Sequence, residues 1–210
     1  MSRRIVIADD HLLVREGLRV LLEQAGFELV GEALDGVTAL RLCGELQPDV
    51  AVLDLGMPLL NGADCAREIR RVSPKTATIV LTMYDDDRYL TETIRAGAMG
   101  YVLKSAPADE LLEAIDVVLS GDVYVLGETL TREALRDTLE RKSPNDLLTT
   151  RERQVLNLVV AGRATKEIAS DLGISIKTAE SHRVRIMKKL NTHNTAGLVR
   201  YAIRVGLALP

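Results

Sequence analysis

The sequence has few of the features that mark secreted, membrane or redox proteins. No apolar run approaches the roughly 18 residues that a membrane-spanning helix needs. Met1–Arg4 leads directly into a strand-like run, so we expect neither a signal peptide nor a membrane anchor. The two cysteines, Cys43 and Cys65, lack a metal-binding spacing, which favours reduced, buried thiols in a cytoplasmic protein. No glycine-rich phosphate loop follows the first strand-like run, which argues against a flavin or nucleotide binder.

Charge is divided unevenly along the chain, whose formal net charge is −3. Residues 147–210 contain 11 lysines and arginines against 4 acidic residues, a net charge of +7. Residues 1–146 contain 16 against 26, a net charge of −10. An acidic N-terminal part joined to a basic C-terminal part suggests that only the C-terminal part binds a polyanion.

Short apolar runs alternate with amphipathic segments over roughly the first 120 residues. The runs are almost continuously apolar, as in Val50–Leu53, which indicates strands buried on both faces and therefore a parallel sheet with helical crossovers. Five such units predict an α/β, doubly wound, flavodoxin-like domain with the strand order 2-1-3-4-5. The predicted strands are residues 5–8, 28–32, 50–53, 78–81 and 100–103, and the predicted helices are 12–25, 36–46, 62–72, 86–96 and 108–119.

The alternation of strands and helices stops at Ser120. We predict that residues 1–121 form the first domain, that 122–146 form a linker with one helix, and that 147–210 form a small, all-α, four-helix domain. The predicted helices are residues 131–141 in the linker, followed by 150–161, 165–172, 176–190 and 194–206.

Polar side chains follow four of the predicted strands at the point where each strand ends. Because the carboxyl ends of parallel strands meet at one edge of a sheet, we expect these side chains to form a ligand site. Clustered carboxylates suit Mg²⁺, which takes hard oxygen ligands, keeps several waters and binds phosphate oxygens. The residues are Asp9, Asp10, Asp54, Thr82 and Lys104.

Asp54 is the best candidate in this group for a nucleophile that forms an aspartyl phosphate. It is central in the predicted sheet and precedes a turn at Gly56–Pro58. Lys104 would hold the incoming phosphoryl group through its charge, and Thr82 could donate a hydrogen bond to it.

Residues 165–190 have the pattern helix, glycine turn, helix, which predicts a helix-turn-helix whose second helix enters the DNA major groove. Ala179, Ile186 and Leu190 share the apolar face of that helix, with His182 and Arg183 on its edges. We expect His182 to be a hydrogen-bonded packing residue. The opposite face places Val184, which suits a thymine methyl, among charged residues that suit phosphates and guanine edges. The candidate DNA contacts are Lys177, Thr178, Glu180, Ser181, Arg183, Val184, Arg185 and Lys188.

The strand-end residues, together with a tyrosine three positions before the lysine, form a specific joint motif: Asp9-Asp10, Asp54–Pro58, Thr82, Tyr101 and Lys104. With this motif, residues 1–120 resemble the receiver domain of two-component response regulators.

That resemblance implies phosphoryl transfer from the phosphohistidine of a sensor histidine kinase to Asp54. It also implies a Mg²⁺ ion held by Asp10, Asp54 and the backbone carbonyl of Gly56, with Asp9 acting through a water. Thr82 would then move toward the phosphoryl group while Tyr101 turns inward as a switch.

The basic tail carries a second set of motif residues: Leu148–Glu152, Lys166–Ala169, Ile174-Ser175, Lys177-Thr178, His182 and Lys189-Leu190. With these it resembles the LuxR-type helix-turn-helix of the NarL/FixJ response regulators. Ala179 replaces the usual valine, and Glu180 stands where some members have a basic residue, which leaves the base preference open. The resemblance implies that the final helix, Thr195–Gly206, supports dimerisation on DNA, with paired half-sites.

The prediction is a cytoplasmic, DNA-binding transcriptional response regulator that phosphorylation of Asp54 activates and that forms a homodimer when phosphorylated. We expect that this protein binds no membrane and that it is not an enzyme beyond slow self-dephosphorylation. Two alternatives stay open: a Mg²⁺-dependent phosphohydrolase with an aspartyl nucleophile, and a constitutive DNA-binding regulator with a purely structural first domain. Such hydrolases often carry a second acid two residues after the nucleophile, where this chain has Gly56.

Overall fold

The protein is described by a computed structural model, which covers residues 2–130 and 147–204. The chain divides into two compact units, Met1–Arg141 and Lys142–Pro210. The linker helix predicted over residues 131–141 lies outside the described residues. Within them, no helix is long and apolar enough to cross a membrane.

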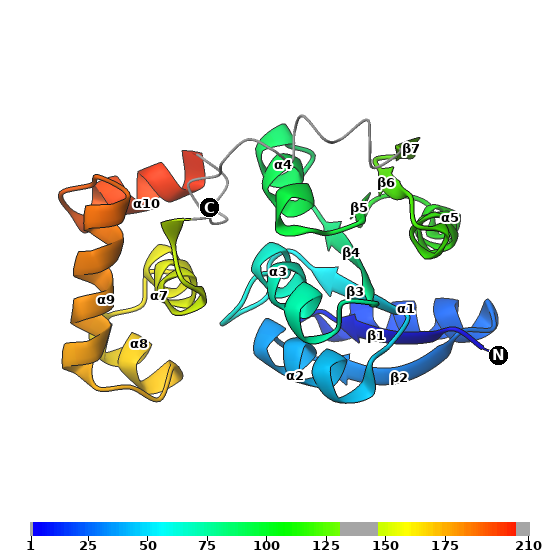
Figure 1. Cartoon of the computed structure of the whole chain (residues 1–210), viewed down its shortest axis with the longest axis horizontal. Helices are drawn as coiled ribbons and strands as arrows, with labels where there is room; N and C mark the ends of the chain where they lie inside the picture. The colour runs from blue at the N-terminus through cyan, green and yellow to red at the C-terminus, as the bar shows by residue number, and fades with distance from the viewer. Residues whose placement is uncertain (1, 131–146, 205–210) are drawn as a thin grey trace. The chain divides into compact units, whose positions relative to one another are not determined.

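The first unit is built on one sheet with the strand order β2-β1-β3-β4-β5-β6-β7 (Figure 1). Strands β1 to β6 pair in parallel, and β7 pairs antiparallel with β6. The order of the first five strands is the predicted 2-1-3-4-5. The strands are β1 (Arg4–Ala8), β2 (Glu28–Ala33), β3 (Val50–Asp54), β4 (Ala77–Thr82), β5 (Gly100–Leu103), β6 (Val123–Val125) and β7 (Glu128–Leu130).

The prediction of five strands was wrong by two, because a short hairpin at residues 123–130 extends the sheet beyond β5. These residues fall inside the range predicted as linker. The turn uses Leu126 and Gly127, both with positive φ, of 47° and 84°, as the tight turns of two-residue hairpins require. Three-residue strands are too short to show a period, so the sequence pattern does not reveal them.

Helices cover both faces of the sheet (Figure 1). One face carries α1 (Leu12–Gln24) and α5 (Ala108–Ser120), whose apolar residues share a core with β1, β3 and β4. The other face carries α2 (Gly36–Leu46), α3 (Gly62–Val72) and α4 (Asp87–Ala96), packed in that order. The central strands β3 and β4 are buried along their whole length, which is what their almost continuous apolar sequence predicts.

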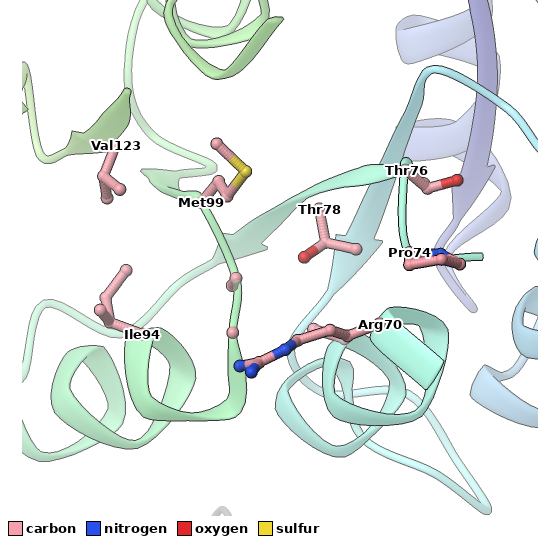
Figure 2. A pocket seen from close by; sticks show the side chains of 10 residues that line it. Arg70, Pro74, Thr76, Thr78, Ile94, Met99 and Val123 are labelled. Carbon is pink, nitrogen blue, oxygen red and sulfur yellow. The ribbon is translucent and has the colours of Figure 1, made fainter. Parts of the chain in front are cut away.

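A smaller apolar cluster joins the hairpin to α4. Ile94 of α4 packs with Val123 and Val125 of β6. Figure 2 shows Ile94 and Val123 among the side chains that line one pocket. Tyr124, between the two valines in the sequence, is buried in the core that α1 and α5 share with the sheet. The hairpin is therefore part of the first unit and is held on both of its faces.

The second unit contains the four predicted helices around one apolar core. Ser175 caps α9 by accepting a hydrogen bond from the N–H of Thr178 at 3.1 Å, and the turn before it uses Gly173 with a positive φ. Thr149 and Glu152 form a capping box at the start of α7. The helices are α7 (Thr150–Val160), α8 (Thr165–Asp171), α9 (Ile176–Lys189) and α10 (Thr195–Arg204).

Candidate functional site

The carboxyl ends of β1, β3, β4 and β5 bring the predicted polar residues to one edge of the sheet. The ammonium nitrogen of Lys104 lies 2.6 Å from Asp9 Oδ2 and 2.8 Å from Asp54 Oδ1. Asp9, Asp54 and Thr82 are buried, so this ion-pair network lies largely out of water. Side chains almost a hundred residues apart in the sequence thus form one site, as the parallel topology predicts.

Asp10 lies at the solvent side of the same site. Asp9, Asp10, His11 and Asp54 each offer an atom, and these atoms all lie within 4.8 Å of one another. The Nδ1 atom of His11 lies 2.9 Å from Asp10 Oδ1 and 3.1 Å from Asp9 Oδ1. Sequence reasoning does not predict this contact, although His11 directly follows the acidic pair.

The donor set fits a small, hard cation. Three carboxylates converge, and Asp10 is exposed, which leaves one side open for water and phosphate ligands. The backbone of Gly56 also reaches the site, because its N–H donates a hydrogen bond to the Asp54 carboxylate.

The electrostatics of the pair Asp54 and Lys104 reflect its burial. Burial raises the pKa of the Asp54 carboxyl above its ordinary value, although Lys104 and the Gly56 N–H act in the opposite direction. Burial alone would lower the pKa of Lys104, but its hydrogen bonds with Asp54 and Asp9 raise that pKa overall. The lysine therefore stays charged beside the candidate nucleophile.

Arg15 stabilises the backbone of the loop that carries Asp9 and Asp10. Its guanidinium Nη1 donates a 2.8 Å hydrogen bond to the main-chain carbonyl of Asp9, and its side chain is buried. Glu32 of β2 lies 3.9 Å from Arg15 Nε and 3.0 Å from Arg19 Nε. Arg15 precedes Leu18 by three residues on the buried face of α1, a position from which its burial could have been predicted.

Gly62, the first residue of α3, packs directly against the end of β3. A Cβ at this position would lie 2.5 Å from the carbonyl oxygen of Asp54. The N–H of Gly62 also donates a 3.1 Å hydrogen bond to the carbonyl of Leu55. A side chain here would push the backbone of the candidate nucleophile, so the close approach requires glycine.

Thr82 and Tyr101 are linked through Tyr84. The Thr82 hydroxyl accepts a 3.0 Å hydrogen bond from the N–H of Tyr84, and the Tyr101 hydroxyl donates one of 2.8 Å to the Tyr84 carbonyl. Tyr101 is fully buried and points inward. Burial raises the pKa of Tyr101 to about 12, although a hydrogen bond with Thr82 acts in the other direction.

The exposed face of α9 carries seven of the eight residues predicted to contact DNA. Val184 is 60% exposed, so its side chain is accessible on this face. Arg183 differs from the other seven: it is half-buried, and it donates hydrogen bonds to Thr165 at 2.6 Å and to Thr195 at 2.8 Å.

His182 is half-buried, and the predicted hydrogen bond is not found at its Nδ1 atom. That atom is buried and has no hydrogen-bond partner within the described part of the chain. Burial, helped by the charge of Arg185, lowers the pKa of His182 below its ordinary value. The ring is therefore neutral near pH 7.

The end of α9 is held by a buried acid. Lys189 Nζ lies 2.6 Å from the Oε2 atom of Glu152, which is itself buried. Burial would raise the pKa of Glu152, but Lys189 and the capping contacts of Thr149 lower it overall. This pair joins α9 to α7.

Comparisons with known proteins agree with both halves of this description. Residues 5–116 match the family described as response regulator receiver domain, and residues 146–202 match bacterial regulatory proteins of the luxR family. The oxygen regulatory protein NreC of Staphylococcus carnosus is 40% identical over 96% of this chain and 97% of its own length.

Solved structures give the same result. The receiver domain of the response regulator NarL from Mycobacterium tuberculosis is 34% identical, with a TM-score of 0.55 over 57% of this chain and 98% of that one. RcsB from Salmonella enterica, bound to a promoter in the presence of phosphomimetic BeF₃⁻, is 30% identical, with a TM-score of 0.59 over 96% of this chain and 98% of that one.

The fold, the acidic sheet edge and the helix-turn-helix define a two-component response regulator that binds DNA. Within that class, the chain belongs to the NarL/FixJ family, with a receiver domain followed by a LuxR-type helix-turn-helix domain. The predicted family, fold class and class of function are confirmed.

Proposed function

We propose that Asp54 is the phosphoacceptor of this response regulator and that its phosphorylation controls DNA binding by α9. The observation that carries the proposal is the contact of Lys104 with both Asp9 and Asp54 at 2.6 and 2.8 Å. A buried carboxylate held beside a fixed cation at the open edge of a parallel sheet is positioned to accept a phosphoryl group.

In the transfer, an oxygen of the Asp54 carboxylate attacks the phosphorus of the kinase phosphohistidine. The O–P bond forms as the P–N bond breaks, and the imidazole leaves with the electron pair of that bond. Lys104 balances the charge that collects on the phosphoryl oxygens, because its ammonium is already oriented toward Asp54. Thr82 supplies a hydroxyl at the same edge.

Asp10, Asp54 and the Gly56 carbonyl would hold Mg²⁺, with Asp9 acting through a water. The convergence of the three carboxylates supports this assignment. When bound, the ion neutralises negative charge on the phosphoryl group and on the carboxylates. The negative charge of Asp54 and Asp9 would then be balanced partly by the ion, so that Lys104 becomes free to bind the phosphoryl group.

Thr82 and Tyr101 are the switch that senses the phosphoryl group. A phosphoryl oxygen at Asp54 would accept a hydrogen bond from the Thr82 hydroxyl and draw that hydroxyl away from the Tyr84 N–H, from which it now accepts. Because the Tyr101 hydroxyl binds the carbonyl of the same Tyr84, a shift of Thr82 changes the position of the loop that leads into α4. Tyr101 is already fully buried in this structure, so in the proposed switch phosphorylation would stabilise an inward position that the side chain already holds.

The protein contacts DNA through α9 and binds paired half-sites as a homodimer. RcsB structures contain DNA, and one contains two RcsB dimers bound to two parallel DNAs. The exposed residues Lys177, Thr178, Glu180, Ser181, Val184, Arg185 and Lys188 support base and phosphate contacts in the major groove. The protein acts in the cytoplasm, and beyond accepting a phosphoryl group it catalyses at most the slow loss of that group.

Labelling with radioactive acetyl phosphate in the presence of Mg²⁺ tests the assignment. The wild-type chain takes up one phosphoryl group, and Asp54→Asn takes up none, because the amide cannot act as the nucleophile. Asp116→Asn, an exposed acid on α5, is the matched control and keeps full labelling. Undiminished labelling of Asp54→Asn would refute the assignment, and steady release of phosphate would favour the hydrolase alternative.

A further inference from the structure

The recognition helix α9 is anchored by few apolar side chains. All 14 of its residues are described, and only Ala179 and Ile186 among them are buried. These two lie seven positions apart, within about 20° of each other around the axis. Met187 of α9 is only partly buried but also packs against the core of the second unit, about 100° around the axis from Ile186. With a side-chain radius of about 5–6 Å, a rotation of about 20° would move the surface of α9 by about 2 Å.

Polar contacts add restraints on this rotation at three levels along α9. Ser175 caps its start, and Lys189 pairs with buried Glu152 at its end. Between them, Arg183 Nη1 donates to the hydroxyl of Thr165 at 2.6 Å, and Nη2 donates to the hydroxyl of Thr195 at 2.8 Å.

The two acceptors of Arg183 come from two different helices. Thr165 is the first residue of α8, and Thr195 is the first residue of α10. A planar guanidinium that donates to both fixes the direction of its own side chain. It thereby relates the rotation of α9 to the starts of both neighbouring helices.

We propose that Arg183 is a positioning residue, which sets the rotation of α9 through Thr165 and Thr195, and not a DNA contact. The proposal rests on DNA reading by α9. Arg185, two residues further on, makes the contrast clear: it is exposed and has no hydrogen bond or ion pair with any residue in the described part of the chain. Arg185 is therefore available to DNA, whereas both terminal nitrogens of Arg183 are engaged.

The test uses the full chain with acetyl phosphate and Mg²⁺ present, and a duplex that the wild type selects from a random pool. A scrambled duplex of the same composition is the non-specific competitor. The variants are Arg183→Met, Arg183→Lys, Thr165→Val, Thr195→Val and the double threonine variant, with Arg185→Met as the matched control. Affinity is measured over a range of salt concentrations, together with thermal unfolding of each variant.

Loss of the hydrogen bonds from Arg183 to Thr165 and Thr195 should lower affinity for the selected duplex about tenfold, roughly the value of one base contact. Affinity for the scrambled duplex should be much less affected. The double threonine variant should reproduce most of this loss with an unchanged salt slope, because it removes no charge. Arg183→Lys keeps the charge but cannot donate to both hydroxyls, so it should behave like Arg183→Met in specificity. Arg185→Met should instead reduce the salt slope by about 0.9, the contribution of one phosphate contact.

Three results would overturn the proposal. One is wild-type specificity in the double threonine variant. Another is full rescue by Arg183→Lys together with a salt slope lowered in Arg183→Met, which would make Arg183 a phosphate contact. The third is a loss that follows the folded fraction equally on both duplexes, which would make Arg183 a purely structural residue. If the wild type selects no duplex at all, DNA reading by α9 fails as well, and this separates the two proposals.

Discussion

The two functional regions of this protein are built in opposite ways. The receiver site collects Asp9, Asp54, Thr82 and Lys104 from four strands and buries most of their surface. The face of α9 that we propose to contact DNA consists of near neighbours on one helix, and its side chains are exposed. The first site depends on tertiary structure for its existence, and the second depends on it only for orientation.

This difference predicts different responses to substitution. In the buried site each charge is satisfied by the others, so removing one leaves its partners unpaired in a low dielectric. On the exposed face each side chain acts almost alone and is screened by water and salt. Single changes should therefore be severe in the receiver and graded in the helix-turn-helix.

The largest effect is expected for Lys104→Met, which removes the cation from the receiver site. Phosphorylation by acetyl phosphate should slow on the order of a hundredfold, because the charge on the phosphoryl group loses its fixed partner. The rate of labelling measures it, with Lys75→Met, an exposed lysine, as the control. A wild-type rate in Lys104→Met would show that the buried network is not part of the transfer.

Gly62→Ala should destabilise the receiver by about 1–3 kcal/mol, because the new Cβ would lie 2.5 Å from the Asp54 carbonyl oxygen. Gly17→Ala is the matched control: its Cβ meets no atom within 4 Å, and it should stabilise α1 by about 0.5–1 kcal/mol. Urea unfolding measures both. If both variants changed the free energy of unfolding in the same direction, the result would contradict the close packing at Gly62.

Lys188→Ala tests the exposed region. DNA affinity should fall severalfold on specific and scrambled duplexes alike, and the salt slope should fall by about 0.9. Lys75→Ala in the receiver serves as the control for a general loss of positive charge. An unchanged slope would remove Lys188 from the interface and weaken the contrast drawn above.

The smallest effect is expected for the pH dependence of stability due to His182. Its pKa in the folded chain lies below the ordinary 6.5, so the unfolded chain binds the proton more tightly. This contribution to stability is complete above about pH 6.5 and is lost as the pH falls through the folded pKa. Between about pH 7.5 and 5.5, the wild type should lose a few degrees more in Tm than His182→Gln. An equal loss of Tm in the wild type and in His182→Gln would contradict the lowered pKa of His182.

Much of the receiver follows from the sequence because its strands are almost continuously apolar. Runs such as Val50–Leu53 specify buried parallel strands, and parallel strands place their carboxyl ends together. The sequence therefore predicts one shared site for Asp9, Asp54, Thr82 and Lys104. The hairpin at Val123–Leu130 could not be predicted in this way, because its three-residue strands form only by pairing, β6 with β5 and β7 with β6.

By itself, the sequence determined the two-domain organisation of strand-helix units followed by helices, the division of charge and the membership of the acidic site. These properties depend on local periodicity and on residue type. Only the tertiary structure decided that Arg15 supports Asp9, that Gly62 touches the Asp54 carbonyl, and that Arg183 joins three helices. Such contacts depend on distances between elements that are far apart in the chain, and no local pattern encodes those distances.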